Sequence, residues 1–589
     1  MKLRTGAVTA GAVALALLAA ACSSKSTTST SPSTGTGGGA AAFNAAVTGI
    51  VNPSTKKGGT LKLVTDADAD SYDGARFYYA WMFDFSRLYL RTLVTNAVGP
   101  GQASLKLTND LASSQDISAD GLTYTYKLKD GIKFEDGTPI TSKDVKYGIE
   151  RVFAQDVLPG GPTYLPGVLD EGQKYPGPYK DTDPNKLGLK SVTTPDDKTI
   201  VFKLATPDAD FPYLLAMGGA SPVPVAKDTG AKYTNHPVAS GPYMFKSYQP
   251  GKSLVLTRNP NWDPATDTVR KALPDEIDLT VITDDDEKDN QLLDGTADLD
   301  VDQVGVQSAA QAKILLNPDL KKNADNPTTG FTRYFSINTQ VAPFTNIDCR
   351  KAVQYAADKV ALQTARGGPV AGGEVAPSMF PQNNPAYDAT LTPYTGTAGT
   401  PDITKAKAAL TACGQPNGFK TVIATQSTSK GQKVAQALQQ ALAKVGITAT
   451  IDATDPANYY SATIGTPSNV HKKGYGIMAA GWGADYPTPA GFLQVLVDGR
   501  RIQQAGGNTN TAELNDPQIN SLIDQATKET DLTKVADLWK QVDKLVMDSA
   551  TYLPYVFDKA LNWRGSRLTN VYVASYVGMV DFQSLGVSS

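Results

Sequence analysis

The sequence predicts an α/β protein with mixed sheets, because strand-like and helix-like segments alternate along it. Residues 421–425 and 448–451 have the apolar, β-branched composition of strands, and residues 434–445 between them repeat apolar side chains at helical spacing. This strand, helix, strand order predicts two parallel strands joined by a right-handed crossover. The alternation has no fixed repeat length, which argues against a solenoid.

Other segments fit the same class. Residues 58–65 indicate a strand after a turn, and residues 75–94 indicate a helix whose aromatic stripe, beginning at Tyr78, is mostly core but could partly line a cleft. Two amphipathic helices are expected late in the chain, over residues 519–526 and 535–546.

A further helix start is predicted between two strands. Residues 122–128 and 199–204 indicate strands, and between them Thr141 can cap a helix while Asp144 reaches back to it.

Composition excludes several functions. The chain has 589 residues, of which 41% are hydrophobic and 19% charged, typical of a globular protein of roughly four folding units or of two or three large lobes. A formal net charge of -3 gives no basic field, so we expect no nucleic-acid partner. With only 2 His, a His-rich metal site is disfavoured, and we expect no metal and no cofactor.

The N-terminus has the form of an export signal. Two basic residues precede an apolar run that is too short for a membrane span and ends in small residues at Cys22. We predict a signal peptide over residues 1–21, and the small residues before Cys22 resemble the lipobox of bacterial lipoproteins, although Ala19 stands where Leu is preferred. Simple secretion is the alternative. Residues 22–57 include a Ser, Thr and Gly tract that predicts a flexible tether.

Two cysteines remain if Cys22 is acylated. Cys349 and Cys413 would then lie in an exported compartment, which permits a disulfide worth about 2–4 kcal/mol. We expect this bridge; two separate buried thiols are the alternative.

Catalytic motifs are missing from the sequence. It contains no GxSxG, HExxH, GxxxxGK[ST] or strand-linked GxGxxG, and His236 and His471 lie in loop-like contexts. The acidic segment that begins at Asp66 does not match a calcium-binding loop, because Ser71 stands in the place of the turn glycine. The acidic residues 284–287 are better explained as the capped start of a helix.

Five segments, taken in order, resemble the extracytoplasmic solute-binding proteins of ABC importers, specifically the large family 5 that includes oligopeptide- and dipeptide-binding proteins. The first carries the most specific match, a strand that runs into an FxDGTP turn and a helix beginning TSKDV. The segments are residues 124–145, 240–262, 334–359, 481–493 and 551–562.

The resemblance implies a periplasmic-binding-protein-like type II fold, in which two lobes meet at a hinge and an extra domain is inserted in the N-terminal lobe. Carried onto this chain, lobe I comprises residues 58–88, 205–300 and 555–589. The inserted domain is expected over residues 89–204 and lobe II over residues 301–554.

The resemblance also implies ligand-binding residues in the segment GWGADYPTP. Asp485 stands where oligopeptide binders place the carboxylate that meets the peptide α-amino group, since a buried ammonium needs a charged partner. Trp482, Ala484 and Tyr486 are expected beside it, the two aromatic residues as an apolar wall. Gly483 and the PTP after Tyr486 depart from the oligopeptide binders, and a loop Asp that caps a turn is the alternative.

The implied function is solute capture by hinge closure. We expect a monomeric, lipid-anchored receptor without enzymatic activity, located on the outer face of the bacterial cytoplasmic membrane and thus extracytoplasmic or periplasmic. It would capture peptides and deliver them to an ABC permease and ATPase complex. The alternatives are a surface lipoprotein that senses a peptide or binds a protein partner without transport, a relative that binds a non-peptide solute such as a sugar, and a secreted hydrolase with an unrecognised triad.

Overall fold

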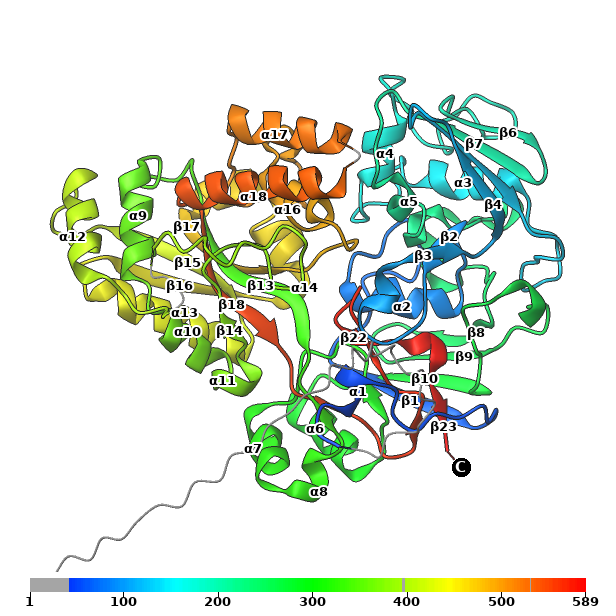
Figure 1. Cartoon of the computed structure of the whole chain (residues 1–589), viewed down its shortest axis with the longest axis horizontal. Coiled ribbons are helices and arrows are strands. Elements are labelled where there is room, and N and C mark those ends of the chain that lie inside the picture. The colour runs from blue at the N-terminus through cyan, green and yellow to red at the C-terminus, as the bar shows by residue number, and fades with distance from the viewer. Residues whose placement is uncertain (1–41, 395–397, 530, 589) are drawn as a thin grey trace, which may run out of the picture. The chain divides into compact units, whose positions relative to one another are not determined.

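The computed structural model describes residues 42–394, 398–529 and 531–588 (Figure 1). The expected signal peptide and Cys22 lie outside the described residues. The described chain forms two lobes of mixed α/β structure, with a further small sheet inserted in the first lobe. Within this part of the chain, no helix is long and apolar enough to cross a membrane.

A five-stranded sheet in the order β11-β1-β10-β9-β8 forms the core of lobe I. β1 runs parallel to β10 and β11, whereas β9 and β8 extend the sheet antiparallel. Leu61 and Leu63 of β1 are buried while Lys62 between them is exposed, which confirms the predicted strand. The strands are β1 Thr60–Thr65, β8 Tyr243–Gln249, β9 Ser253–Arg258, β10 Glu276–Val281 and β11 Leu299–Asp300.

The helix after β1 is shorter than the sequence pattern indicates. α2 spans Ala80–Phe85 and then tightens into a 3-10 turn over Ser86–Leu88. At this turn Arg87 pairs with Asp84 at 3.0 Å and directs its other donors to neighbouring segments, so tertiary bonds override the helical periodicity. Most of the aromatic stripe is buried as predicted, whereas Tyr78 is half-buried and lines a cleft.

The inserted domain is built on a four-stranded antiparallel sheet in the order β4-β5-β7-β6. Its helix α3 begins at the predicted capping box, where the Asp144 carboxylate accepts hydrogen bonds from the Thr141 backbone at 2.8 Å and from its hydroxyl at 2.7 Å. α5 Phe211–Leu214, expected in lobe I, packs with the inserted domain instead, because Phe211 and Leu214 share a core with Phe202 of β7. The other elements are β2 Val94–Asn96, β3 Leu107–Asn109, β4 Ala112–Ile117, β5 Thr123–Leu128, α3 Ser142–Arg151, α4 Tyr164–Leu169, β6 Val192–Asp196 and β7 Thr199–Lys203.

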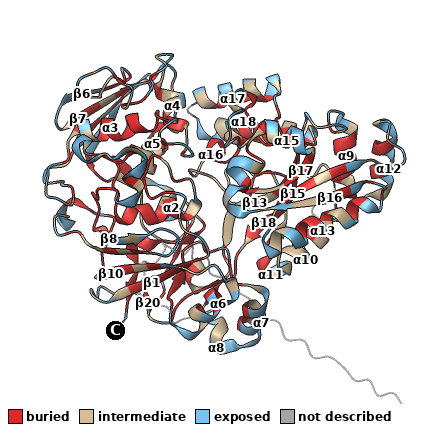
Figure 2. Cartoon of the chain, turned by 180° about the vertical axis from the view of Figure 1, so that it is seen from behind, coloured by how far each residue is buried: buried red, intermediate tan, exposed pale blue. Residues whose placement is uncertain are grey.

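Lobe II is built on a six-stranded sheet in the order β14-β18-β13-β17-β15-β16. β15, α13 and β16 form the predicted strand, helix, strand unit, and the two strands are parallel as expected. Buried residues of the sheet and of α9, α10, α12 and α13, coloured red in Figure 2, belong to one hydrophobic core. The elements are β13 Thr328–Ile337, α9 Ile347–Ala356, α10 Lys359–Arg366, β14 Glu374–Val375, α12 Ile403–Ala412, β15 Lys420–Gln426, α13 Ser429–Ala443, β16 Thr448–Thr454, β17 Tyr475–Trp482, α16 Pro489–Val497, α17 Pro517–Lys528, α18 Leu532–Asp548 and β18 Tyr552–Lys559.

The boundaries between lobe I and lobe II differ from the expected ones in two places. Residues 301–325, expected in lobe II, pack instead beside lobe I, because Val306 and Ile314 share a core with Val64 of β1. β18 continues in the lobe II sheet to Lys559, past the expected boundary at residue 554. The elements of this region are α6 Asp285–Asp294, α7 Ser308–Leu316, α8 Pro318–Lys321, β12 Ala324–Asp325 and β19 Asn562–Trp563, of which α6 is capped by Asp284 as predicted.

The segment expected as the last part of the tether is packed against lobe I. Residues 42–57 are described, and Ala46 and Val51 in this range are buried. The Ala46 backbone donates to the Asp325 carboxylate at 3.0 Å, and Val51 pairs with Val571 of the C-terminal segment. The prediction that the flexible tether extends to residue 57 is therefore wrong for its final part, residues 42–57. The short elements here are α1 Ala45–Thr48, β20 Leu568–Thr569, β21 Val573–Ala574, β22 Met579–Val580 and β23 Gly586–Val587.

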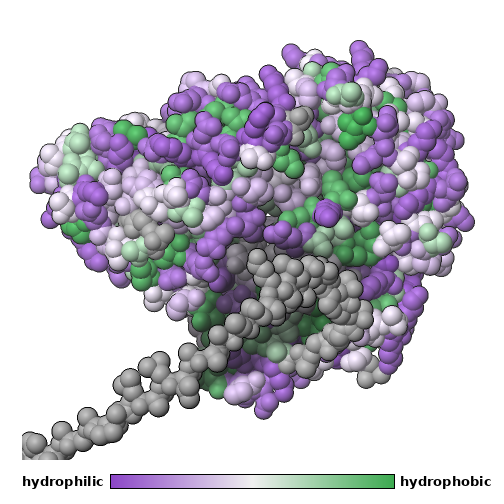
Figure 3. Space-filling view, viewed as in Figure 1, coloured by the Kyte–Doolittle hydropathy of each residue, from purple (hydrophilic) through white to green (hydrophobic). Residues whose placement is uncertain are grey.

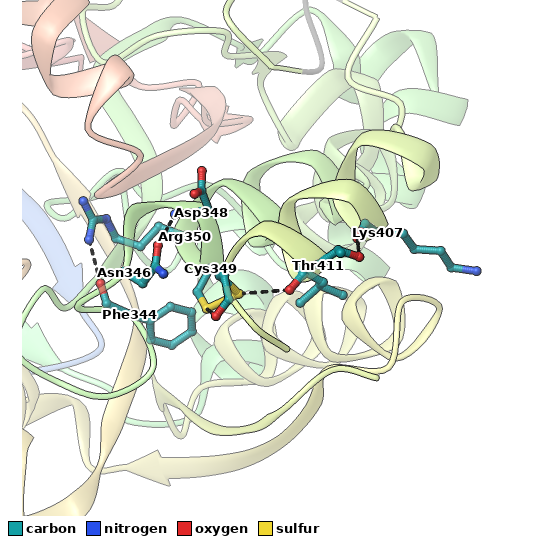
Figure 4. Close-up of a disulfide and its surroundings, with 9 residues drawn as sticks. Phe344, Asn346, Asp348, Cys349, Arg350, Lys407 and Thr411 are labelled. Carbon is teal, nitrogen blue, oxygen red and sulfur yellow. Dashed lines mark hydrogen bonds between the residues drawn. A yellow bond between two sulfur atoms is a disulfide. The ribbon is translucent and has the colours of Figure 1, made fainter. Parts of the chain in front are cut away.

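Cys349 and Cys413 form a disulfide in lobe II (Figure 4). It joins α9 to the end of α12, with the two Cα atoms 5.3 Å apart. Cys349 is fully buried in the lobe II core, and Cys413 packs at its edge. The bridge therefore ties together two helices on the same side of the sheet.

Candidate ligand-binding site

A cleft of about 2860 Å³ is lined by residues of lobe I, the inserted domain and lobe II. On the face seen in Figure 3, hydrophobic residues gather in the right half, near the centre of the molecule. Trp482, Ala484, Asp485 and Tyr486 all line the cleft, so the structure brings the four expected residues together.

Asp485 lies in the loop between β17 and α16. Its backbone N–H donates to the Gly491 carbonyl at 3.0 Å, and Thr488 caps α16 by accepting from the Gly491 N–H at 3.2 Å. The loop is thus held at both ends, which fixes the direction of the Asp485 side chain. Among the described residues, no backbone N–H donates to the Asp485 carboxylate, so Asp485 does not cap the turn that the alternative reading assigned to it.

Two tyrosines from outside lobe II donate to the same oxygen of Asp485. The Tyr78 hydroxyl, just before α2, donates to Oδ2 at 2.6 Å, and the Tyr164 hydroxyl of α4 donates to it as well. Burial raises the pKa of Asp485 to about 7, and these two hydrogen bonds oppose that rise. Within the described chain, Oδ1 accepts no hydrogen bond, so one carboxylate oxygen is left for a ligand.

Aromatic rings surround the carboxylate. Trp482 meets Tyr78 edge to face with ring centroids 6.1 Å apart, and Tyr486 meets Tyr164 edge to face at 5.5 Å. Tyr213 of the inserted domain stacks on Tyr486 at 6.1 Å. The indole Nε1 of Trp482 is buried and has no hydrogen-bond partner among the described residues. The rings therefore present mostly apolar surface around the carboxylate, with the tyrosine hydroxyls and the Trp482 indole N–H as polar groups.

A second carboxylate near these rings makes a hydrogen bond between the inserted domain and lobe II. Asp210 of the inserted domain accepts a hydrogen bond from the Thr488 hydroxyl at 3.0 Å. Burial, and then the neighbouring Asp208, raises the pKa of Asp210 to about 7. This bond and the Tyr164 bond to Asp485 connect lobe II to the inserted domain, and the Tyr78 bond connects lobe II to lobe I.

Sequence analysis identified the residues that lobe II contributes to this site but not the two tyrosines that bind Asp485 from outside lobe II. Tyr78 belonged to a stripe assigned mostly to the core, and Tyr164 was not identified. Tyr164 lies 321 residues from Asp485 in a Gly- and Pro-rich stretch, which carries no local pattern that could reveal the contact. Among the described residues, no group of three or more His, Cys, Asp or Glu side chains is placed to hold a metal ion.

Comparison with known proteins points to one family. The sequence model of bacterial extracellular solute-binding proteins, family 5 Middle, matches residues 106–504. The probable D,D-dipeptide-binding periplasmic protein DdpA of Escherichia coli is 27% identical over 466 residues, which cover 78% of this chain and 80% of that protein. The glutathione-binding protein GsiB of Pectobacterium atrosepticum is 27% identical over 512 residues, covering 86% and 88%.

Solved structures agree with this assignment. Clavulanic acid biosynthesis oligopeptide binding protein 2 superposes with a TM-score of 0.88 at 46% identity, covering 93% of this chain and 99% of that one. The murein tripeptide binding protein MppA of Escherichia coli superposes with a TM-score of 0.74 at 20% identity, covering 92% and 100%, and shows the shared fold.

Proposed function

Because this chain belongs to the bacterial extracellular solute-binding proteins of family 5, we propose that it is the receptor of an ABC importer that captures a peptide through its free amino group at Asp485. Hinge closure encloses the peptide, and the closed receptor delivers it to a permease and ATPase complex. The receptor carries out no catalysis, and a lipid on Cys22 anchors it to the outer face of the cytoplasmic membrane.

The observation that carries the proposal is the half-buried carboxylate of Asp485, which aromatic rings surround in the cleft. An ammonium that enters among these rings loses water, and the free Oδ1 of Asp485 replaces it with a charge-assisted hydrogen bond. The tyrosine hydroxyls on Oδ2 come from lobe I and the inserted domain, so the same carboxylate connects the ligand to closure. The 46% identical oligopeptide binding protein supports a peptide as the solute.

The test is binding of a tripeptide library and of the same library N-acetylated, measured by native mass spectrometry. The proposal predicts that the free-amine library is retained and that acetylation abolishes retention. Asp485→Asn should lose the free-amine library, whereas the matched control Asp116→Asn, an exposed carboxylate on β4, should retain it. Equal retention of both libraries, or full retention by Asp485→Asn, would falsify the proposed role of this residue.

A further inference from the structure

Lobe II also meets the lobe I side of the molecule outside the cleft. α11 spans Gly368–Ala371 in lobe II and packs against α7, which lies beside lobe I. The Gln311 side chain of α7 donates to the Gly367 carbonyl at 3.3 Å, and Ala371 shares a core with Ile314 of α7. Gln311, Gly367 and Ala371 do not line the cleft, so this contact is separate from the ligand-binding site.

Asn326 makes a second hydrogen bond across this contact. It stands between β12 and β13, where the chain passes into lobe II, and its side-chain amide donates to the Val370 carbonyl at 2.9 Å. Its backbone N–H donates to Oδ1 of Asn44 at 2.7 Å, and the Asn44 N–H donates to the Ala324 carbonyl at 3.0 Å. The N-terminal segment that packs on lobe I therefore holds Asn326 in place.

Each side of the contact is fixed to its own lobe. In lobe II, Gln363 of α10 donates to the Gly373 carbonyl at 2.7 Å just after α11, and a Cβ on Gly373 would lie 2.2 Å from the Phe557 carbonyl oxygen of β18. On the other side, the Gln307 N–H before α7 donates to the Asp289 carboxylate of α6 at 2.6 Å. We therefore expect α11 to move with lobe II and α7 to move with lobe I.

The contact lies on the other side of the hinge from the cleft. In Figures 1 and 2, α4 and α16 lie in the upper part of the molecule, whereas α7 and α11 lie in the lower part, beside the segments that connect the lobes. A rotation of lobe II that widens the cleft presses α11 toward α7. Because packed side chains are nearly incompressible, this rotation has to shear the contact and break its two hydrogen bonds.

We propose that α7, Asn326 and α11 form a brace behind the hinge, which resists opening of the cleft and so sets the fraction of ligand-free protein that is closed. The brace needs no solute, because its hydrogen bonds join protein groups to one another. When only part of the population is competent to bind, the apparent dissociation constant rises in inverse proportion to that fraction. Residues that never touch the solute therefore tune its affinity.

The effect on affinity rests on the proposed function, whereas opening can be measured without any ligand. The first experiment is a distance measurement by electron paramagnetic resonance on the ligand-free protein. Spin labels are attached to Ser114→Cys on β4 of the inserted domain and Lys433→Cys on α13 of lobe II, two exposed positions. Gln311→Ala and Asn326→Ala should each shift population to longer distances. Lys313→Ala, an exposed lysine on α7, is the matched control and should leave the distribution unchanged.

The second experiment is calorimetric titration of the unlabelled variants with a tripeptide that the wild type retains. Removing one hydrogen bond of the brace should lower the affinity about threefold, the usual net effect of one such bond. Because Gln311 and Asn326 bind different carbonyl groups, the double variant should lower it about tenfold. Lys313→Ala should bind like the wild type.

Two results would overturn the brace. Wild-type distance distributions in folded Gln311→Ala and Asn326→Ala would show that the contact does not resist opening. Longer distances with unchanged affinity would show that opening does not limit binding. If Asn326→Ala unfolds, Gln311→Ala decides alone, since its bond lies outside the connecting segments. If the wild type binds no tripeptide, the proposed function fails, and the distance measurements still test the brace.

Discussion

The pKa of Asp485 leads to a quantitative prediction about pH. In the ligand-free protein, burial raises this pKa to about 7, so only part of the population carries the anion that an ammonium requires. The α-amino group of a peptide is protonated below its ordinary pKa near 7.7–8.0. Between pH 5 and 7, ionisation of Asp485 therefore limits binding, and capture of the ammonium releases a proton.

The magnitude follows from the fraction ionised. With a pKa of about 7, roughly half of the carboxylates are ionised at pH 7 and about 1% at pH 5. The affinity for a free-amine peptide should therefore fall roughly 50-fold between these values, equivalent to about 2.3 kcal/mol. Stability of the ligand-free protein should change in the opposite direction, because a raised carboxyl pKa contributes stability at low pH that is lost as pH rises through about 7.

The assay is calorimetric titration of a retained tripeptide at pH 5, 6 and 7, in buffers of different ionisation enthalpy so that the released proton is counted. Asp210, whose pKa is also raised to about 7, lies nearby, so Asp210→Asn is the control and should keep most of the pH dependence. A wild-type affinity that is the same at pH 5 and 7, or a wild-type pH profile in Asp485→Asn, would show that Asp485 does not control the pH dependence.

Three further predictions follow from single contacts. Tyr164→Phe removes a donor to Asp485 across the cleft, so the pKa of the carboxyl should rise and affinity at pH 7 should fall a few-fold; unchanged affinity in calorimetry would argue against the contact. Cys413→Ser opens a bridge with a sequence separation of 64, which should lower the free energy of unfolding by about 4 kcal/mol in urea titration; an unaltered midpoint would contradict this estimate. Gly481→Ala would place a methyl group 2.6 Å from the Arg333 side chain, and this overpacking should lower the free energy of unfolding by about 1–3 kcal/mol in urea titration; an unchanged free energy of unfolding would show that strand and arginine are not packed this closely.

Local sequence patterns predicted the parts of the fold that local chemistry determines. The capping box at Thr141 and the parallel β15–α13–β16 unit were both predicted correctly, because a helix cap and a crossover depend on residues close in sequence. The helix expected over residues 75–94 was shortened by Arg87, whose partners lie in other segments. Burial of residues 42–57 likewise depends on distant strands that no local pattern specifies.

The candidate site likewise contains residues that the sequence could identify and residues that only the fold brings together. Asp485 could be identified because a short motif around it resembles a known family. Tyr164 could not, since its contact joins residues 321 positions apart. The ion pair between Arg333 of β13 and Asp558 of β18 joins neighbouring antiparallel strands. The two residues are 225 positions apart in sequence, so the pair could be predicted only from the register of the sheet. Single ionisable residues in unremarkable strands give no signal until the fold places them together.

The role proposed for Asp485 requires a solute that carries a free amine. It is tested most directly by native mass spectrometry of the protein purified without denaturation, followed by identification of the molecules released on unfolding. We expect the wild type to release peptides with a free amino group, and Asp485→Asn to have lost them. Released molecules that lack an amine, or the same peptides bound to Asp485→Asn at wild-type occupancy, would contradict it.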